Sequence, residues 1–211
     1  MRKPSGCVAG RVCLYFGLVA AMSIISPAAF AQRVQGFDVS QFQGNINWTT
    51  AYNAGVRFAF IRATRGGPMG AQHTDLNVHQ NMAGSSSVPI YTGNYHFGRP
   101  DTMVFPPNPT VDQLIETIVT HSNSEADFFY NTITPYLTPG HLRPVLDLEV
   151  AGSSTPTGRA ILSFWANSFL DRFESRSGVE PLMYMNTNYA TSFYDASIAH
   201  RLAAVRRLMA G

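Results

Sequence analysis

Cysteine is nearly absent from this sequence of 211 residues, and the two that occur, Cys7 and Cys13, lie close to the N-terminus. They fall in a segment with the order of a secretory signal peptide: basic residues, an apolar run and a small-x-small cleavage motif. We therefore expect residues 1–31 to be removed, so that the mature chain begins at Gln32. The mature chain would have no cysteine, which excludes disulfides and cysteine-ligated metals.

Long apolar runs are also scarce. One run, Val12–Ile25, precedes the cleavage motif Ala29-Phe30-Ala31, and no second long run follows it. The run is shorter than the ~20 residues that a transmembrane helix needs, so a cleaved signal is favoured over an uncleaved membrane anchor. We expect a secreted protein, extracellular or periplasmic, without membrane contact after cleavage.

The sequence has few charged residues of either sign. Charged residues make up 13% of the chain, with 15 basic and 13 acidic residues and a formal net charge of +2. Removal of residues 1–31 takes away three basic residues and no acidic one, which changes the net charge to −1. This balance gives no reason to expect nucleic acid or an anionic membrane as a partner. A mature length of about 180 residues fits one domain, which we expect to be a monomer.

What the chain does contain is an alternation of short β-forming segments with segments of helical pattern. The expected strands are Gly36–Ser40, Arg57–Thr64, Ile90–Phe97, Arg143–Val150 and Leu182–Asn186. The expected helices are Ala51–Ala54, Asp75–Ala83, Val111–His121, a segment from Ser124 to about Leu137, and Thr157–Arg176. Such alternation predicts an α/β protein with parallel strands joined by helical crossovers.

Two architectures fit parallel strands, an open doubly wound sheet and a closed barrel. The first strand ends in Phe37-Asp38-Val39-Ser40, without the glycine-rich turn typical of nucleotide-binding open sheets. Each expected strand ends instead in a polar or aromatic group, which is typical of catalytic (β/α) barrels. We therefore expect a TIM-like (β/α) barrel. The proline-rich segment Arg99–Thr110 is expected to leave the third strand, either as a wall of a groove or as an inert loop.

The strongest chemical signal is a pair of acids in Arg143-Pro-Val-Leu-Asp-Leu-Glu-Val150. Because side chains alternate along a strand, Asp147 and Glu149 are expected on one face and the leucines on the other. Two neighbouring carboxylates disfavour joint ionisation, so at least one pKa should be raised. A protonated acid beside a carboxylate is the pair that glycosidic cleavage needs. Taken alone, the pair is also compatible with a solvated strand end or a divalent metal site.

Asp38 ends the first expected strand. In a barrel, this position can face the fourth strand across the mouth, although a turn or helix cap is an alternative role.

Five segments in chain order resemble the muramidases of glycoside hydrolase family 25. They are Gly36–Trp48, Gly55–Gly66, Gly93–Phe97, Val145–Glu149 and Gly178–Tyr184. The resemblance implies a (β/α) barrel that hydrolyses the β-1,4 bond between N-acetylmuramic acid and N-acetylglucosamine in peptidoglycan, with no cofactor and no metal. It implies that Glu149 is the general acid and that Asp147 assists the substrate's acetamido group or stabilises the cation. Asp38 would be a further carboxylate, and a retaining or an inverting outcome stays open.

Five further residues are expected to bind substrate: Tyr95, Phe97, Tyr184, Asn186 and Arg62. The three aromatic residues either stack on sugar rings or pack in the core. The asparagine can hydrogen-bond an acetamido group, and the arginine can pair with a carboxylate of the site or form a structural ion pair. His96 is expected to be a satisfied strand histidine, and the other histidines show no zinc-ligand spacing.

The chain departs from the family pattern after the fifth expected strand. Members of the family continue with closing strands rich in aromatic residues and with another active-site aspartate, whereas Ile198–Gly211 has the pattern of an arginine-rich helix. We expect a catalytic barrel over residues 32–197 that lacks its last closing strands, followed by an atypical tail over residues 198–211. Two alternatives to an active lysozyme are a truncated, inactive barrel that binds glycan and a chitin-type glycosidase.

Overall fold

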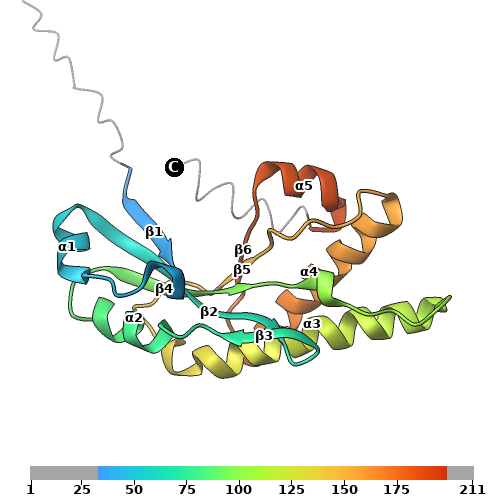
Figure 1. Cartoon of the computed structure of the whole chain (residues 1–211), viewed down its shortest axis with the longest axis horizontal. Helices are drawn as coiled ribbons and strands as arrows, with labels where there is room; N and C mark the ends of the chain where they lie inside the picture. Colours follow the sequence, from blue (N-terminus) through green and yellow to red (C-terminus); the bar gives the residue numbers. More distant parts are fainter. Residues whose placement is uncertain (1–32, 199–211) are drawn as a thin grey trace, which may run out of the picture. The chain divides into compact units, whose positions relative to one another are not determined.

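Five parallel strands form the main sheet and lie side by side in the order in which they occur in the chain (Figure 1). They are β1 (Gln35–Val39), β2 (Val56–Gly67), β4 (Tyr91–Phe97), β5 (Val145–Asp147) and β6 (Leu182–Tyr184). A sixth strand, β3 (Gly70–Thr74), pairs antiparallel with the end of β2 and was not predicted. Strand order without a reversal differs from the doubly wound sheet, whose order reverses at a switch point.

The computed structural model describes residues 33–198 of the chain. The expected signal segment 1–31 and positions 199–211 of the expected tail lie outside the described residues. Within the described range, β1 and β6 each pair with one neighbouring strand, and the sheet is a curled, parallel half-barrel. None of the helices described is long and apolar enough to cross a membrane.

The described helices are α1 (Trp48–Asn53), α2 (Val78–Ser85), α3 (Val111–Ile133), α4 (Pro156–Ser177) and α5 (Thr187–Phe193). Four of the five described helices begin at a polar capping residue whose side chain accepts a backbone N–H group, and α2 is the exception. Short 3-10 turns cover Gln41–Gln43, Pro100–Thr102, Thr134–Tyr136 and Ala196–Ile198. Helix α4 ends at Gly178, which has the left-handed φ of 69° that favours glycine at this position.

Helix α3 corrects the prediction of two separate helical segments. It runs for 23 residues from a capping box in which Thr110 and Gln113 satisfy each other's backbone N–H groups. Ser124, the predicted start of a second helix, lies inside α3 and donates its hydroxyl to the carbonyl of His121 (2.8 Å). This bond satisfies the hydroxyl without a break, and the apolar face of α3 packs on α4 across the same region.

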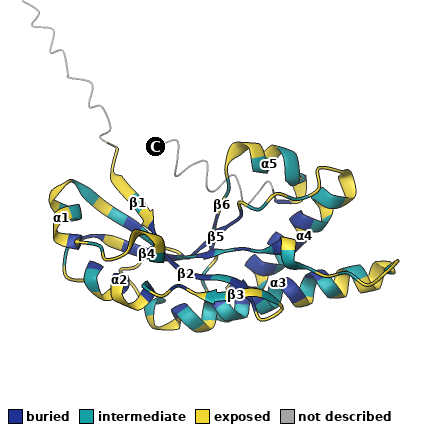
Figure 2. Ribbon diagram, in the orientation of Figure 1, coloured by how far each residue is buried: buried dark blue, intermediate teal, exposed yellow. Residues whose placement is uncertain are grey.

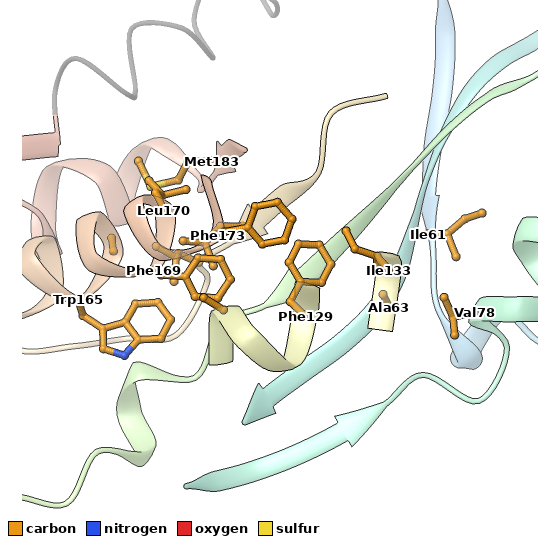
Figure 3. Close-up of a cluster of buried hydrophobic side chains, with 14 of the residues drawn as sticks. Ile61, Ala63, Val78, Phe129, Ile133, Trp165, Phe169, Leu170, Phe173 and Met183 are labelled. Atoms are coloured by element: carbon orange, nitrogen blue, oxygen red, sulfur yellow. The ribbon is translucent and has the colours of Figure 1, made fainter. Parts of the chain in front are cut away.

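The hydrophobic core lies where α3 and α4 pack against each other and the sheet (Figure 2). Phe129 of α3 meets Phe173 of α4 with ring centroids 5.1 Å apart, and Trp165 stacks on Phe169 at 5.6 Å (Figure 3). All four side chains are completely buried. Burial of each stabilises the fold by roughly 1.5–3 kcal/mol. The three aromatic residues of α4 recur at helical spacing, as the sequence predicted.

A bulge at Ala63 changes which residues of β2 share a face. Residues on either side of the bulge pair with successive residues of β4: Arg62 with Tyr95, Thr64 with His96 and Arg65 with Phe97. Paired residues of parallel strands share a face, and side chains of β4 alternate. Arg62 and Arg65 therefore face the same side despite their odd spacing, and Thr64 faces the helices.

Candidate active site

Three carboxyl side chains gather at the carboxyl ends of the parallel strands. Asp147 is the last residue of β5 and is only 8% exposed, whereas Asp38 of β1 and Glu149 are exposed. The pKa of Asp147 is raised from 3.8 to about 8, first by burial and then by the negative charges of Glu149 and Asp38. One carboxyl group of this cluster therefore keeps its proton at neutral pH.

The strand that carries Asp147 is shorter than predicted. It was expected to reach Val150, but β5 ends at Asp147, and Glu149 lies in the irregular segment that follows. The backbone N–H of Leu148 still donates to the carbonyl of Tyr184 (2.9 Å) before the chain leaves the sheet. The predicted burial of the leucines is confirmed, and so is the prediction that one of the two acids has a raised pKa.

One oxygen of Asp147 has no partner. Its Oδ1 atom is buried and accepts no hydrogen bond from the described residues. A buried carboxylate without donors is costly, so the neutral acid is the stable form and the Oδ1 atom is left for a ligand. Arg62 opposes this effect, because its positive charge lowers the pKa of Asp147, but it has the smallest influence of the groups that act on this carboxyl.

Two tyrosines flank the carboxyl cluster from the neighbouring strands. Tyr95 on β4 pairs with Val145, and Tyr184 on β6 pairs with Asp147 itself. Burial raises the pKa of both phenols, and the negative charges of Asp38 and Asp147 raise them further. Both hydroxyls therefore stay protonated and can donate hydrogen bonds. Two of the predicted aromatic residues, Tyr95 and Tyr184, are thus close enough to the predicted acids for the charges of the acids to raise their pKa values.

Arg62 binds an aspartate that the sequence analysis assigned to the start of a helix. Its Nε atom donates to Asp75 Oδ2 (2.8 Å), and one of its terminal nitrogens lies 2.8 Å from the same oxygen. Asp75 also accepts the backbone N–H groups of Gln41 (2.9 Å) and Asn77 (3.0 Å). Helix α2 therefore begins at Val78 and not at Asp75, because this carboxylate joins β2 to the turn after β1.

The remaining predicted binding residues have distinct surroundings. Asn186 is exposed, and its Oδ1 atom accepts the backbone N–H of Tyr189 (3.0 Å), so the side chain caps α5.

Phe97 lies at the end of β4 and lines a hollow of about 580 Å³. The whole lining consists of Gln41, Phe42, Arg62, Arg65, His73 and Phe97. Because Arg62 also acts on Asp147 and Phe97 pairs with it, the hollow adjoins the carboxyl cluster.

Sequence reasoning missed four residues of this lining: Gln41, Phe42, Arg65 and His73. Phe42 is 77% exposed, and the Arg62 guanidinium lies 5.0 Å from its ring centroid. It lies within the first segment that resembles the family, which was the available signal. Arg65 lies in the second such segment, but the bulge that gives it its direction has no sequence signal that we recognised.

A second polar cluster lies on the helix-facing side of β4 and is fully buried. His96 lies 2.8 Å from Thr64 Oγ1 through Nδ1 and 2.8 Å from Glu125 Oε2 through Nε2. The same Glu125 oxygen accepts the backbone N–H of Arg99 (3.0 Å), where the proline-rich excursion begins. The prediction that His96 is a satisfied strand histidine is confirmed. Among the residues described, no three His, Asp or Glu side chains are grouped to hold a metal ion.

Comparison with known proteins identifies the family. The model of glycosyl hydrolases family 25 matches residues 37–106 and 115–204. The N,O-diacetylmuramidase of Arthroderma benhamiae is 26% identical over 178 residues, covering 81% of this chain and 66% of that protein. The N,O-diacetylmuramidase of a Chalaropsis species is 28% identical over 166 residues, covering 75% and 69%.

A solved structure supports the same relationship. The muramidase from Trichobolus zukalii has a TM-score of 0.56 and 26% identity, covering 74% of this chain and 67% of that one. The chain thus spans about two thirds of the length of the relatives it matches. The family model matches the larger part of the chain in two blocks and includes Asp38, Asp147 and Glu149. The chain belongs to family 25 of the glycosyl hydrolases.

Proposed function

We propose that this chain is a lysozyme that hydrolyses the β-1,4 bond between N-acetylmuramic acid and N-acetylglucosamine in peptidoglycan. The observation that carries the proposal is the buried, protonated and unpartnered Asp147 beside the exposed Glu149 at the carboxyl end of the sheet. Relatives named N,O-diacetylmuramidase support the choice of substrate. The wall lies outside the cell membrane, so we propose extracellular or periplasmic action by a monomer that starts at Gln32, which N-terminal sequencing of the exported protein would test.

The scaffold of this activity is, in our proposal, an irregular TIM-like (β/α) barrel. Two features support it: the parallel strands follow chain order, and β1 and β6 each have one pairing edge left within residues 33–198. The described strands supply one part of the wall, and the closing strands are not among them. The acids lie at the carboxyl ends of the strands, where catalytic groups of such barrels lie.

Each acid has a separate role in the proposed reaction. Glu149 is exposed and donates a proton to the leaving glycosidic oxygen. Water then adds a hydroxyl group to the sugar carbon, and the proton that the water releases restores Glu149. Asp147 keeps its own proton, and its unpartnered Oδ1 atom accepts the N–H of the substrate's acetamido group, which orients that group beside the reacting carbon. Asp38 supplies negative charge that favours the oxocarbenium-like transition state. Tyr95 and Tyr184 donate hydrogen bonds, and Phe97 and Asn186 contact the sugars.

Substrates with different leaving groups separate these roles. Glu149→Gln removes the proton donor and should slow hydrolysis of peptidoglycan by about 10²–10⁴-fold. An aryl glycoside with an acidic phenol as leaving group needs no protonation, so this variant should retain most of its rate on it. Asp147→Leu should lose activity on both substrates, because it removes the Oδ1 acceptor that positions the acetamido group, and this positioning is needed in both. Rates on cell walls and on the aryl glycoside give the measurement.

Two controls complete the test. Circular dichroism melting must show that both variants fold, and wall lysis at the native rate by a folded Glu149→Gln protein would remove Glu149 from the role of acid. Analysis of the reducing ends of the products distinguishes the alternatives: new muramic acid ends support a lysozyme, and new glucosamine ends contradict it. Turnover of chitin without turnover of peptidoglycan would favour a chitin-type glycosidase.

A further inference from the structure

The hollow beside the carboxyl cluster has an unusual lining for a site that binds sugars. Two arginines, one histidine, one glutamine and two phenylalanines enclose about 580 Å³. None of the lining residues is acidic, although Phe97 of the lining pairs with Asp147 of the catalytic cluster. The lining is therefore suited to a ligand that is anionic and partly apolar.

The two arginines are not equivalent. The charge of Arg62 is neutralised by Asp75, whose side chain is fully buried. Arg65 is half-buried, and among the described residues no carboxylate lies within ion-pair distance of it. Its guanidinium lies 5.9 Å from the ring centroid of Phe97, which leaves its N–H groups available to the hollow. Of the two arginines in the lining, Arg65 is thus the one without a neutralising carboxylate within residues 33–198.

The direction of Arg65 depends on the bulge at Ala63. In a regular strand, side chains three residues apart point to opposite faces, so Arg65 would point to the helices if Arg62 faced the hollow. The bulge restores Arg65 to the face of Phe97, and Phe97 pairs with Asp147 on the next strand. The bulge thus places the Arg65 guanidinium two strands away from the buried acid Asp147.

The opposite wall of the hollow is held in place by hydrogen bonds. The Oε1 atom of Gln41 lies 2.7 Å from His73 Nε2 and accepts the backbone N–H of Leu76 (3.3 Å). Because an amide oxygen can only accept, Nε2 of His73 carries the proton in this contact. Gln41 and His73 thereby link the turn after β1 to the β2–β3 hairpin.

We propose that this hollow binds the carboxylate-bearing substituent of N-acetylmuramic acid, with Arg65 as the residue that recognises the charge. Muramic acid differs from glucosamine by a lactyl ether, which ends in a carboxylate or continues into a peptide with carboxylates of its own. A guanidinium matches a carboxylate with two parallel hydrogen bonds, and the phenylalanines accept the apolar part of the substituent. The inference rests on the proposed lysozyme function and makes Arg65 the residue that discriminates peptidoglycan from chitin.

Binding measurements test the inference without any need for turnover. Calorimetric titrations use the full chain with Glu149→Gln, with and without Arg65→Gln, against three glycans. These are peptidoglycan fragments that keep their peptides, the same glycans without peptides, and neutral oligomers of N-acetylglucosamine. We expect Arg65→Gln to weaken binding of a carboxylate-bearing glycan by about 10-fold or more and to leave the neutral oligomer unchanged. Arg65→Lys should restore part of the affinity, because it keeps the charge without the fork.

The pattern of losses identifies the carboxylate. If Arg65→Gln loses affinity for the peptide-free glycan, the carboxylate that Arg65 binds belongs to the lactyl group. If affinity is lost only for the peptide-bearing fragments, the carboxylate belongs to the peptide. Arg57→Gln is the matched control, because Arg57 is an exposed arginine at the other end of β2 and should leave all three affinities unchanged. Equal weakening for all three glycans, or none, would overturn the inference. If the protein binds these glycans but cleaves none before Glu149 is replaced, the proposed function fails while the binding inference stands.

Discussion

Two buried aspartates near the same arginine have opposite surroundings. Asp75 accepts two backbone N–H groups and the Arg62 guanidinium, so each of its oxygens has a donor. Asp147 is also buried, but its Oδ1 atom has no donor among the described residues, and the carboxyl groups around it add negative charge. Burial alone therefore does not decide what a carboxyl group does. The donors around it decide whether it stays charged and holds the fold or keeps a proton for a ligand.

The largest effect on stability is expected at Asp75. Asp75→Ala leaves Arg62 buried without its counter-charge, and loss of one partner of a buried pair costs about 3–5 kcal/mol. Urea unfolding followed by circular dichroism measures the change. In the double variant Asp75→Ala/Arg62→Met, the part of this loss that comes from the unpaired charge should be recovered, whereas the backbone N–H groups of Gln41 and Asn77 still lack their acceptor. A double variant no more stable than the single one would show that the charge of Arg62 is not the cause.

A pH-dependent effect, smaller per pH unit, is expected at Asp147. Its pKa is raised to about 8 in the folded state, so between pH 4 and pH 8 the folded state binds more protons at this site than the unfolded state. Stability contributed by the site is therefore fully present below pH 4 and is lost as the pH rises to 8. The wild type should lose stability relative to Asp147→Asn with a slope of up to about 1.4 kcal/mol per pH unit.

Denaturant unfolding at intervals from pH 5 to pH 9 checks this slope. The difference in free energy of unfolding between the two proteins should change up to about pH 8 and then level off. A difference that stays constant over this range would mean that Asp147 ionises normally in the folded protein and would weaken its contrast with Asp75.

The smallest effect on stability is expected at a solvent-exposed ion pair. Arg143 and Glu180 are 2.8 Å apart, as close as Arg62 and Asp75, but their side chains are 43% and 47% exposed. Glu180→Gln should change the free energy of unfolding by less than about 1 kcal/mol, because water screens exposed pairs. The same denaturant titrations provide the measurement. A loss as large as that of Asp75→Ala would show that burial is not what distinguishes the two pairs.

The sequence predicted where the five parallel strands lie because each falls in a stretch rich in β-forming residues between polar segments, although β5 and β6 end earlier than predicted. Strand β3 was not predicted, because Gly70–Thr74 is short and polar and its pairing depends on the hairpin with β2. The interruption expected before Ser124 did not occur, because contacts between α3 and α4 outweigh the local preference of serine and asparagine for turns.

The acids of the candidate site were predicted from the sequence, but the difference in burial between Asp147 and Glu149 was not. Alternation along a strand places Asp147 and Glu149 on one face and treats them alike. The end of β5 after Asp147 leaves one buried and the other exposed, and it depends on pairing with β4 and β6. Arg65 was missed for a related reason, since a bulge resets the alternation on which sequence reasoning relies.

The order of the parallel strands in the sheet has a consequence for the synthesis of the protein. Each new parallel strand pairs with the one synthesised before it, so no strand has to insert between neighbours that already exist. Each addition closes one crossover loop, and the entropy of closure rises by only about 0.6 kcal/mol for each doubling of loop length. The sheet can thus grow at one edge while the chain leaves the ribosome. The turn after β1 and the hairpin of β2 and β3 form early, and β5 then brings Asp147 to an edge that is already built.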